Sequence, residues 1–70
     1  MRYSSHARKR MIDRTVTEAE VLAILANPGR GTFAPPGRDV IEHFGNLADG
    51  RPLNVVTNRA RTLVITIIVQ

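Results

Sequence analysis

Apolar residues in the first third of the chain recur with helical spacing. Ser4 or Ser5 can cap a helix that passes through Met11 and ends near Arg14, because a serine hydroxyl accepts hydrogen bonds from the first free backbone amides of a helix. The β-branched pair Thr15-Val16 and a new start signal follow at once. The pattern therefore predicts one short helix that ends before residue 15.

A second helix start follows at Thr17. Thr17 and Glu20 have the spacing of a capping box, and Val16 can pack on Val21 as a hydrophobic staple. The run Asn27-Pro28-Gly29 ends the helix, because the residue before a proline is pushed out of the α region and a glycine follows. The first third of the chain is thus predicted to be a helix pair.

The remainder of the chain has strand patterns separated by turn residues. Asp49-Gly50 is a hairpin signal between two of the strands. The last strand is apolar on both of its alternating faces, which predicts a central place in a sheet. We predict strands over Asp39–Leu47, Leu53–Asn58 and Thr62–Val69, and a short strand or a loop at Thr32–Ala34.

These elements predict a single α+β domain over residues 1–70. Its two N-terminal helices would pack on one face of a three- to four-stranded antiparallel sheet, because that arrangement buries the apolar helix stripe and the last strand together. The other face of the sheet would remain partly wet.

Composition narrows the classes of protein that the chain can represent. The 70 residues include no Cys and only two His, so disulfides and a thiolate metal site are excluded, and we expect neither a metal nor a cofactor. The longest apolar run, Leu63–Val69, is too short to cross a bilayer. No signal segment is evident, so the expected location is the cytoplasm, without membrane contact.

The net charge of +4 is concentrated at the start of the chain. The first fourteen residues hold five cations and one acid, whereas the remaining residues hold five of each. A concentrated positive patch attracts phosphates, which points to RNA or another anionic partner. A solvated, arginine-rich helix explains the same composition equally well.

The cations of the first helix include a regular stripe with a histidine. His6, Arg10 and Arg14 follow one another at intervals of four residues, so they share one side of the helix. Guanidinium groups fork phosphate oxygens, and an imidazole exchanges protons near neutral pH. The stripe is therefore a candidate catalytic site for RNA cleavage, although arginine stems that cover an apolar edge would give the same spacing.

Other candidate residues extend this surface. Arg8, Lys9, Arg51 and Arg61 are candidate RNA-binding residues, and His43 is a candidate second acid or base, or else a packing residue within its strand. The chain has only one Tyr, two Phe and no Trp. This scarcity disfavours a platform that stacks several bases and favours recognition or cleavage of the RNA backbone.

The sequence also resembles a bacterial and phage family of small domains of unknown function, which is similar to RelE-type toxin-fold proteins. The resemblance rests on Ser5-His6-Ala7, Arg10-Met11, Arg14, Val16-Thr17 and Val21, and continues through Asn27-Pro28, Gly50–Val56 and Leu63–Ile67. It implies a RelE-like arrangement of two helices and an antiparallel sheet. It also implies an RNA endonuclease of a toxin-antitoxin pair, with an antitoxin or another protein as partner.

Three functions follow as hypotheses. In the first, the domain is a toxin-like, metal-independent endoribonuclease, in which Arg10 and Arg14 bind the scissile phosphate and His6 transfers the proton. The products would carry a 2′,3′-cyclic phosphate. In the second, the same stripe binds nucleic acid or an acidic partner without cleavage, and in the third it only maintains helix-sheet packing.

Overall fold

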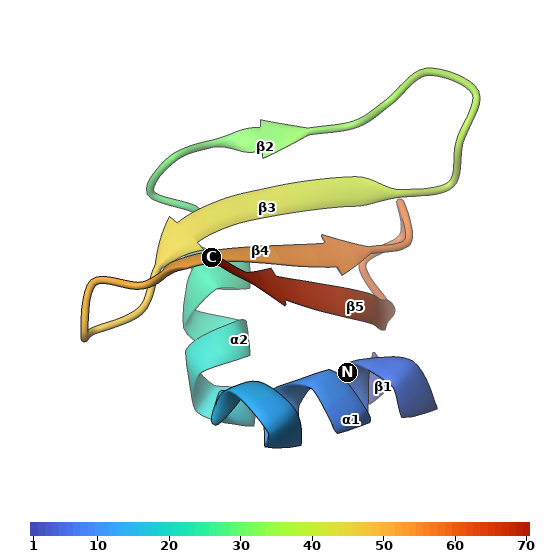
Figure 1. The fold of residues 1–70 in the computed structure, drawn as a ribbon. Coiled ribbons are helices and arrows are strands. Elements are labelled where there is room, and N and C mark those ends of the chain that lie inside the picture. Colours follow the sequence, from blue (N-terminus) through green and yellow to red (C-terminus); the bar gives the residue numbers. More distant parts are fainter.

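A computed structural model describes residues 1–70 and places two helices against one side of a five-stranded sheet (Figure 1). The helices are α1 (Ser5–Arg14) and α2 (Glu18–Ala26). The strands are β1 (Arg2–Tyr3), β2 (Thr32–Phe33), β3 (Ile41–Asn46), β4 (Pro52–Thr57) and β5 (Leu63–Val69). The predicted α+β class and the order of helices before the long strands are confirmed.

Local capping interactions explain where the helices begin and end. The Ser4 hydroxyl accepts a hydrogen bond from the Ala7 amide at 2.9 Å, and Thr15 leaves α1 in the left-handed conformation. Thr17 and Glu20 form both halves of a capping box at the start of α2, and Asn27 is its C-cap. The predicted helix ends are confirmed, because each depends on hydrogen bonds between near neighbours in the sequence.

The sheet is larger than predicted and is mixed rather than antiparallel. Its strand order is β1-β5-β4-β3-β2, with β1 parallel to β5 and all other neighbours antiparallel. The predicted three- to four-stranded antiparallel sheet lacked β1, a strand of two residues that the chain forms just before α1. A strand of two residues is too short to show an alternating pattern in the sequence. It also forms by pairing with a distant segment, which local sequence does not reveal.

The last strand was predicted to be central, and β5 does lie inside the sheet between β1 and β4, although β4 occupies the middle. β1 pairs only with Leu63 and Val64, so the rest of β5 has no neighbouring strand on that side. Ile68 keeps 40% of its surface exposed, which shows that apolar residues on both faces did not require burial on both faces.

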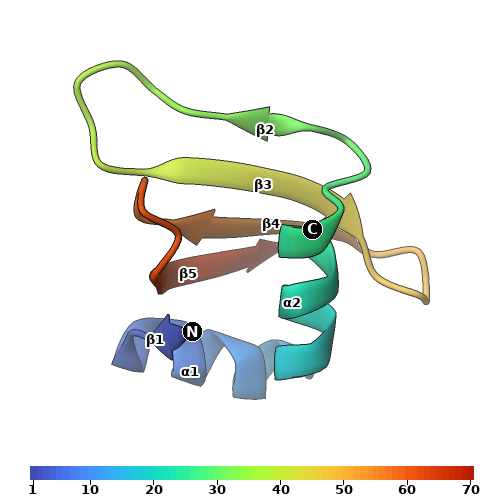
Figure 2. The ribbon, with the colours of Figure 1, turned by 180° about the vertical axis from the view of Figure 1, so that it is seen from behind.

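The hydrophobic core lies between the sheet and the two helices, which cover the same face (Figure 2). The fully buried strand residues Leu53, Val55, Val64 and Ile67 meet Ala7 and Met11 of α1 and Val21 and Ile24 of α2. β3 approaches α2 closely at Gly45, where an added Cβ atom would lie 3.0 Å from the Ile24 side chain. The opposite face of the sheet has no helix over it (Figure 1). No helix is long and apolar enough to span a membrane.

Candidate nucleic-acid interface

The orientation of α1 places the His6, Arg10 and Arg14 stripe beside the buried seam of the domain. Ala7 and Met11 are buried in the core, which fixes how the helix is turned. His6 and Arg14 are exposed, and Arg10 is half-buried between them. Each residue lies about one turn from the next, roughly 6 Å along the helix axis. The three side chains therefore share one side of α1, as the spacing predicted.

Arg10 is held in place by the open side of β5. Its Nε donates a hydrogen bond to the Ile67 carbonyl at 3.3 Å, and the Ser4 hydroxyl donates to the Ile65 carbonyl at 2.6 Å. Together, these side chains satisfy two carbonyl groups of the strand edge that β1 does not reach. The two terminal guanidinium nitrogens of Arg10 have no partner in the protein, so they remain available to an anion.

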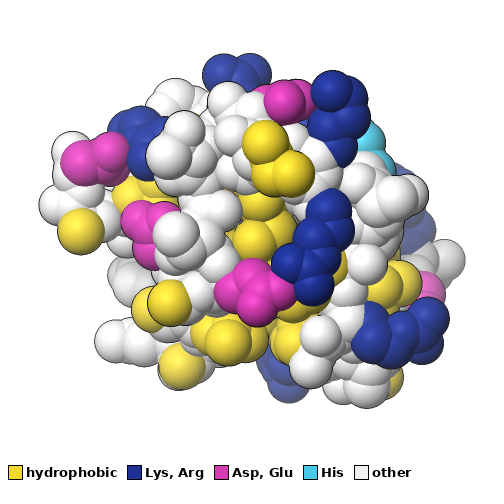
Figure 3. All heavy atoms as spheres, turned by 90° about the horizontal axis from the view of Figure 1, so that it is seen from below, with side chains coloured by type: hydrophobic (Ala, Val, Ile, Leu, Met, Phe, Trp, Pro, Cys, Tyr) yellow, Lys and Arg dark blue, Asp and Glu magenta, His cyan; other side chains and the backbone are white.

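The two other cations of α1 that were predicted to bind RNA are paired with acids. Arg8 forms an ion pair with Glu18 that links the two helices, and Lys9 lies 3.4 Å from Asp13 one turn further along α1. The Arg8 guanidinium also stacks over the Tyr3 ring, 4.4 Å from its centre. Burial raises the pKa of the Tyr3 hydroxyl, Glu18 raises it further, and Arg8 partly opposes the shift. Figure 3 shows acidic groups and apolar atoms among the basic side chains on the side seen from below.

Arg51 binds the C-terminal end of α1. Its Nη1 donates to the Arg14 carbonyl at 2.8 Å, and its Nε donates to Asp49 at 2.7 Å. The guanidinium therefore satisfies a free carbonyl at the negative end of the helix dipole and connects α1 to the β3–β4 hairpin. The Arg14 side chain itself makes no hydrogen bond or ion pair.

Every carboxylate of the chain is already engaged within the protein. Asp13, Glu18 and Asp49 form ion pairs, whereas the other three accept hydrogen bonds from uncharged donors. These are Glu20 from Thr17, Asp39 from the Arg59 amide, and Glu42 from Asn54. Seven of the ten cations are left without an acidic partner, namely Arg2, Arg10, Arg14, Arg30, Arg38, Arg59 and Arg61. Two of the seven belong to the predicted stripe.

His43 lies in the interior and not on the surface. Only 1% of the residue is exposed, and its Nε2 is 2.9 Å from the Thr57 hydroxyl. That hydroxyl donates to the Asn58 carbonyl, so it accepts the Nε2–H of a neutral imidazole. Burial, and secondarily the charge of Arg61, lowers the pKa of His43. The structure does not bring His43 together with His6 on the surface of α1.

Arg61, the remaining candidate, lies in the turn between β4 and β5. Its backbone adopts a left-handed conformation with φ of 58°, and its side chain is exposed without an ion pair. The turn also holds Arg59, whose sequence position near a hairpin end fits either an anion-binding residue or an ordinary solubilising arginine. Nothing in the local pattern distinguishes Arg59 from other turn arginines, because its partners lie about twenty residues earlier in the chain.

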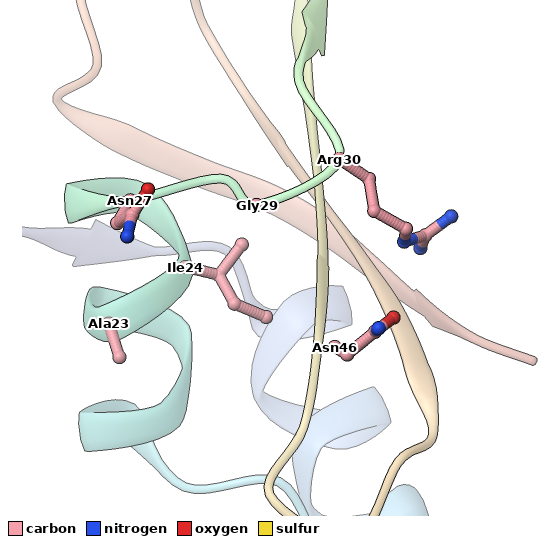
Figure 4. A pocket seen from close by; sticks show the side chains of 6 residues that line it. All are labelled: Ala23, Ile24, Asn27, Gly29, Arg30 and Asn46. Atoms are coloured by element: carbon pink, nitrogen blue, oxygen red, sulfur yellow. The ribbon is translucent and has the colours of Figure 1, made fainter.

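One hollow, of about 410 Å³, lies at the C-terminal end of α2. It is lined by Ala23, Ile24, Asn27, Gly29, Arg30 and Asn46, and Figure 4 shows the Arg30 and Asn46 side chains extending to the same side. None of the candidate residues from the sequence lines this hollow. No three His, Asp or Glu side chains gather as a metal-binding set.

Fold and surface together define a small α+β domain with a helix pair on one face of a mixed sheet and a set of unopposed arginines. The chain belongs to the family described as a domain of unknown function (DUF4258), whose model matches residues 3–69. The predicted membership of a family of small domains of unknown function is thereby confirmed. No curated protein and no solved structure matches the chain.

Proposed function

We propose that this domain binds RNA through the phosphate backbone, with Arg10 and Arg14 of α1 as the central contacts. The observation that supports this function is the distribution of charge pairs. All six carboxylates are engaged inside the protein, whereas these two guanidinium groups on one side of α1 have no acidic partner. An external polyanion would supply the missing negative charge.

Arg10 suits phosphate binding better than a freely moving surface arginine does, because a hydrogen bond within the protein orients its side chain. The hydrogen bond from Nε to the Ile67 carbonyl orients the guanidinium, and its terminal nitrogens stay free. A planar, preoriented guanidinium loses less side-chain entropy when it forks two phosphate oxygens. Arg14 adds a second donor group one turn further along the same helix.

RNA cleavage is the second candidate function, and the exposed His6 favours it. His6 lies one turn from Arg10, so an imidazole and a guanidinium could reach one phosphodiester together. Neutral His6 would accept the proton of the ribose 2′-hydroxyl as O2′ bonds to phosphorus. The resulting imidazolium would then protonate the 5′-oxygen as its bond to phosphorus breaks, leaving a 2′,3′-cyclic phosphate. This scheme needs one histidine and does not use the buried His43.

The resemblance to RelE-type toxins supports the cleavage scheme and an antitoxin as the protein partner. An antitoxin could neutralise the domain by covering the basic side of α1, because an acidic segment would compete with RNA for Arg10 and Arg14. The cytoplasm is the compartment in which such a pair would act.

One experiment tests both functions. Labelled single-stranded RNA is incubated with the protein in EDTA, and bound RNA and fragment ends are measured for the natural chain, for Arg10→Gln/Arg14→Gln, and for His6→Gln. Binding that the double variant loses supports the RNA-binding function. Cyclic-phosphate ends that the natural chain produces and His6→Gln does not would support the cleavage function as well. Intact RNA that is bound equally by all three proteins would contradict both proposals.

A further inference from the structure

Three segments that are distant in the sequence bring four arginines to one end of the sheet. The Arg2 amide donates to the Thr62 carbonyl at 3.1 Å, which places β1 beside the β4–β5 turn. In that turn, Arg59 Nε donates to the Arg38 carbonyl at 2.6 Å, which adds the loop before β3. We call this group of residues, Arg2, Arg38, Arg59 and Arg61, the arginine end.

The arginine end has almost no negative charge of its own. Asp39 is the acidic residue in these segments, and its carboxylate accepts the Arg59 amide at 2.9 Å. The Arg59 guanidinium contacts only the carbonyl groups of Arg38 and Pro35, so its charge is not neutralised. Arg2, Arg38 and Arg61 are exposed and form no ion pair. Four cations against the single carboxylate of Asp39 leave a net positive charge that attracts anions.

The backbone that presents these charges is held firmly. The Asn58 side chain accepts hydrogen bonds from the Thr62 and Leu63 amides, at 2.9 and 3.1 Å, and donates to the Thr62 hydroxyl. This network encloses Arg61, whose φ of 58° is uncommon for a residue with a side chain. A left-handed arginine that the surrounding turn maintains is the kind of local strain found at binding sites.

The arginine end continues into α1. The Ser4 amide donates to the Val64 carbonyl at 3.0 Å, so α1 starts where β5 starts, beside the β4–β5 turn. From there, α1 runs away from the arginine end toward the β3–β4 hairpin, where Arg51 meets the Arg14 carbonyl. Cations without an acidic partner therefore occur near both ends of α1, with Arg2 just before its first residue and Arg14 at its last.

We infer that the arginine end is a second phosphate-binding surface, which holds the same single-stranded RNA beyond the segment bound by Arg10 and Arg14. This inference rests on the proposed function for the identity of the polymer. It assigns a role to Arg2 and Arg38, which the sequence alone did not single out, and joins them to Arg59 and Arg61 of the β4–β5 turn. We expect contacts with phosphates, because guanidinium groups without a carboxylate partner bind negatively charged oxygens most strongly.

The test compares the salt dependence of oligouridylate binding, in EDTA, for four proteins. These are the natural chain, Arg38→Gln/Arg61→Gln, Arg10→Gln/Arg14→Gln, and the control Arg8→Gln/Lys9→Gln. The control also loses two positive charges, but from residues that are already paired with acids. Loss of two single-strand phosphate contacts lowers the magnitude of the logarithmic salt slope by about 1.4. Circular dichroism confirms that each variant is folded.

The expected result is a shallower slope for Arg38→Gln/Arg61→Gln and an unchanged slope for the control. If only Arg10→Gln/Arg14→Gln has a shallower slope, the arginine end is not a phosphate surface, and the proposed function survives. If only Arg38→Gln/Arg61→Gln has one, the second surface stands, and the assignment of binding to α1 is wrong. Salt-independent binding, or no binding, by the natural chain overturns both.

Discussion

Arg10 and Ile67 join the first helix to the last strand: the Arg10 Nε donates to the Ile67 carbonyl at 3.3 Å, on the edge of β5 that β1 leaves unpaired. The contact has two consequences. It protects part of a strand edge that could otherwise pair with another chain, and it points a guanidinium outward with its terminal nitrogens free. Arg10 thus combines a structural role with the proposed binding role.

The structural role predicts a stability effect that is specific to Arg10. Arg10→Met keeps most of the apolar stem and removes the donor, so we expect a loss of about 0.5–1.5 kcal/mol in the free energy of unfolding, measured by urea denaturation. Arg14→Met is the matched control, because the Arg14 side chain makes no hydrogen bond, and it should change stability by less than about 0.5 kcal/mol. Equal effects of the two substitutions would show that the Ile67 contact contributes nothing.

The buried His43 predicts that the domain becomes less stable in mild acid. Burial, followed by the charge of Arg61, lowers the pKa of His43 in the folded state, so the unfolded chain binds a proton more readily. The resulting stabilisation is complete above the unfolded pKa of about 6.5 and is lost as the pH falls from there through the folded-state pKa.

Urea denaturation across this range should show the decline in the natural chain and in His6→Gln, whose imidazole is exposed. In His43→Gln, the part of the decline that comes from His43 should be absent. Glutamine can still donate a hydrogen bond toward Thr57, which helps to preserve the fold. A His43→Gln profile identical in shape to that of the natural chain would contradict the assignment.

The close approach of β3 to α2 predicts that Gly45 cannot be enlarged without cost. In Gly45→Ala, the new Cβ would lie 3.0–3.3 Å from three atoms of the Ile24 side chain. Such overpacking costs about 1–3 kcal/mol. Removing the Ile24 atoms in Gly45→Ala/Ile24→Ala should make the double variant more stable than the sum of the two single losses predicts. Simple additivity would mean that the two residues do not compete for space.

The hydrogen bonds of the Arg59 side chain predict that it restricts the motion of the loop before β3. Its guanidinium donates to the Pro35 carbonyl at 2.7 Å and to the Arg38 carbonyl at 2.6 Å. Arg59→Ala should therefore lower the NMR order parameters of the Gly37, Arg38 and Asp39 amides, with little change in those of β4. Arg38→Ala serves as the control, because it removes an equal charge but keeps the carbonyl that Arg59 binds. The same order parameters in both variants would exclude this role of Arg59.

The parts of the fold that were predictable from the sequence are those determined by near neighbours. Ser4, Thr17 and Glu20 mark helix starts because their partners lie three residues away. β1 was not predictable, since its two residues pair with β5 about sixty residues later. The apolar pattern of β5 correctly indicated a strand inside the sheet, but it could not show that β1 pairs with only two of its residues.

In the candidate site, too, local features were predictable from the sequence and contacts between distant segments were not. The stripe on α1 follows from helical spacing, which is a local property. The pairing of Arg8 with Glu18 and the contact of Arg51 with α1 join different elements, so a one-dimensional pattern could not reveal them. The burial of His43 had one available signal, because it alternates with the apolar Ile41 and the compact Gly45 on a single face of its strand.

The role of Arg10 and Arg14 is tested by the salt dependence of single-stranded RNA binding. The proteins to compare are the natural chain, Arg10→Gln/Arg14→Gln and the equally charged control Arg8→Gln/Lys9→Gln. A phosphate site at Arg10 and Arg14 predicts a logarithmic slope whose magnitude falls by about 1.4 in the first variant and stays unchanged in the control. Equal slopes for both variants would show that binding follows net charge alone, which would contradict a phosphate site built from Arg10 and Arg14.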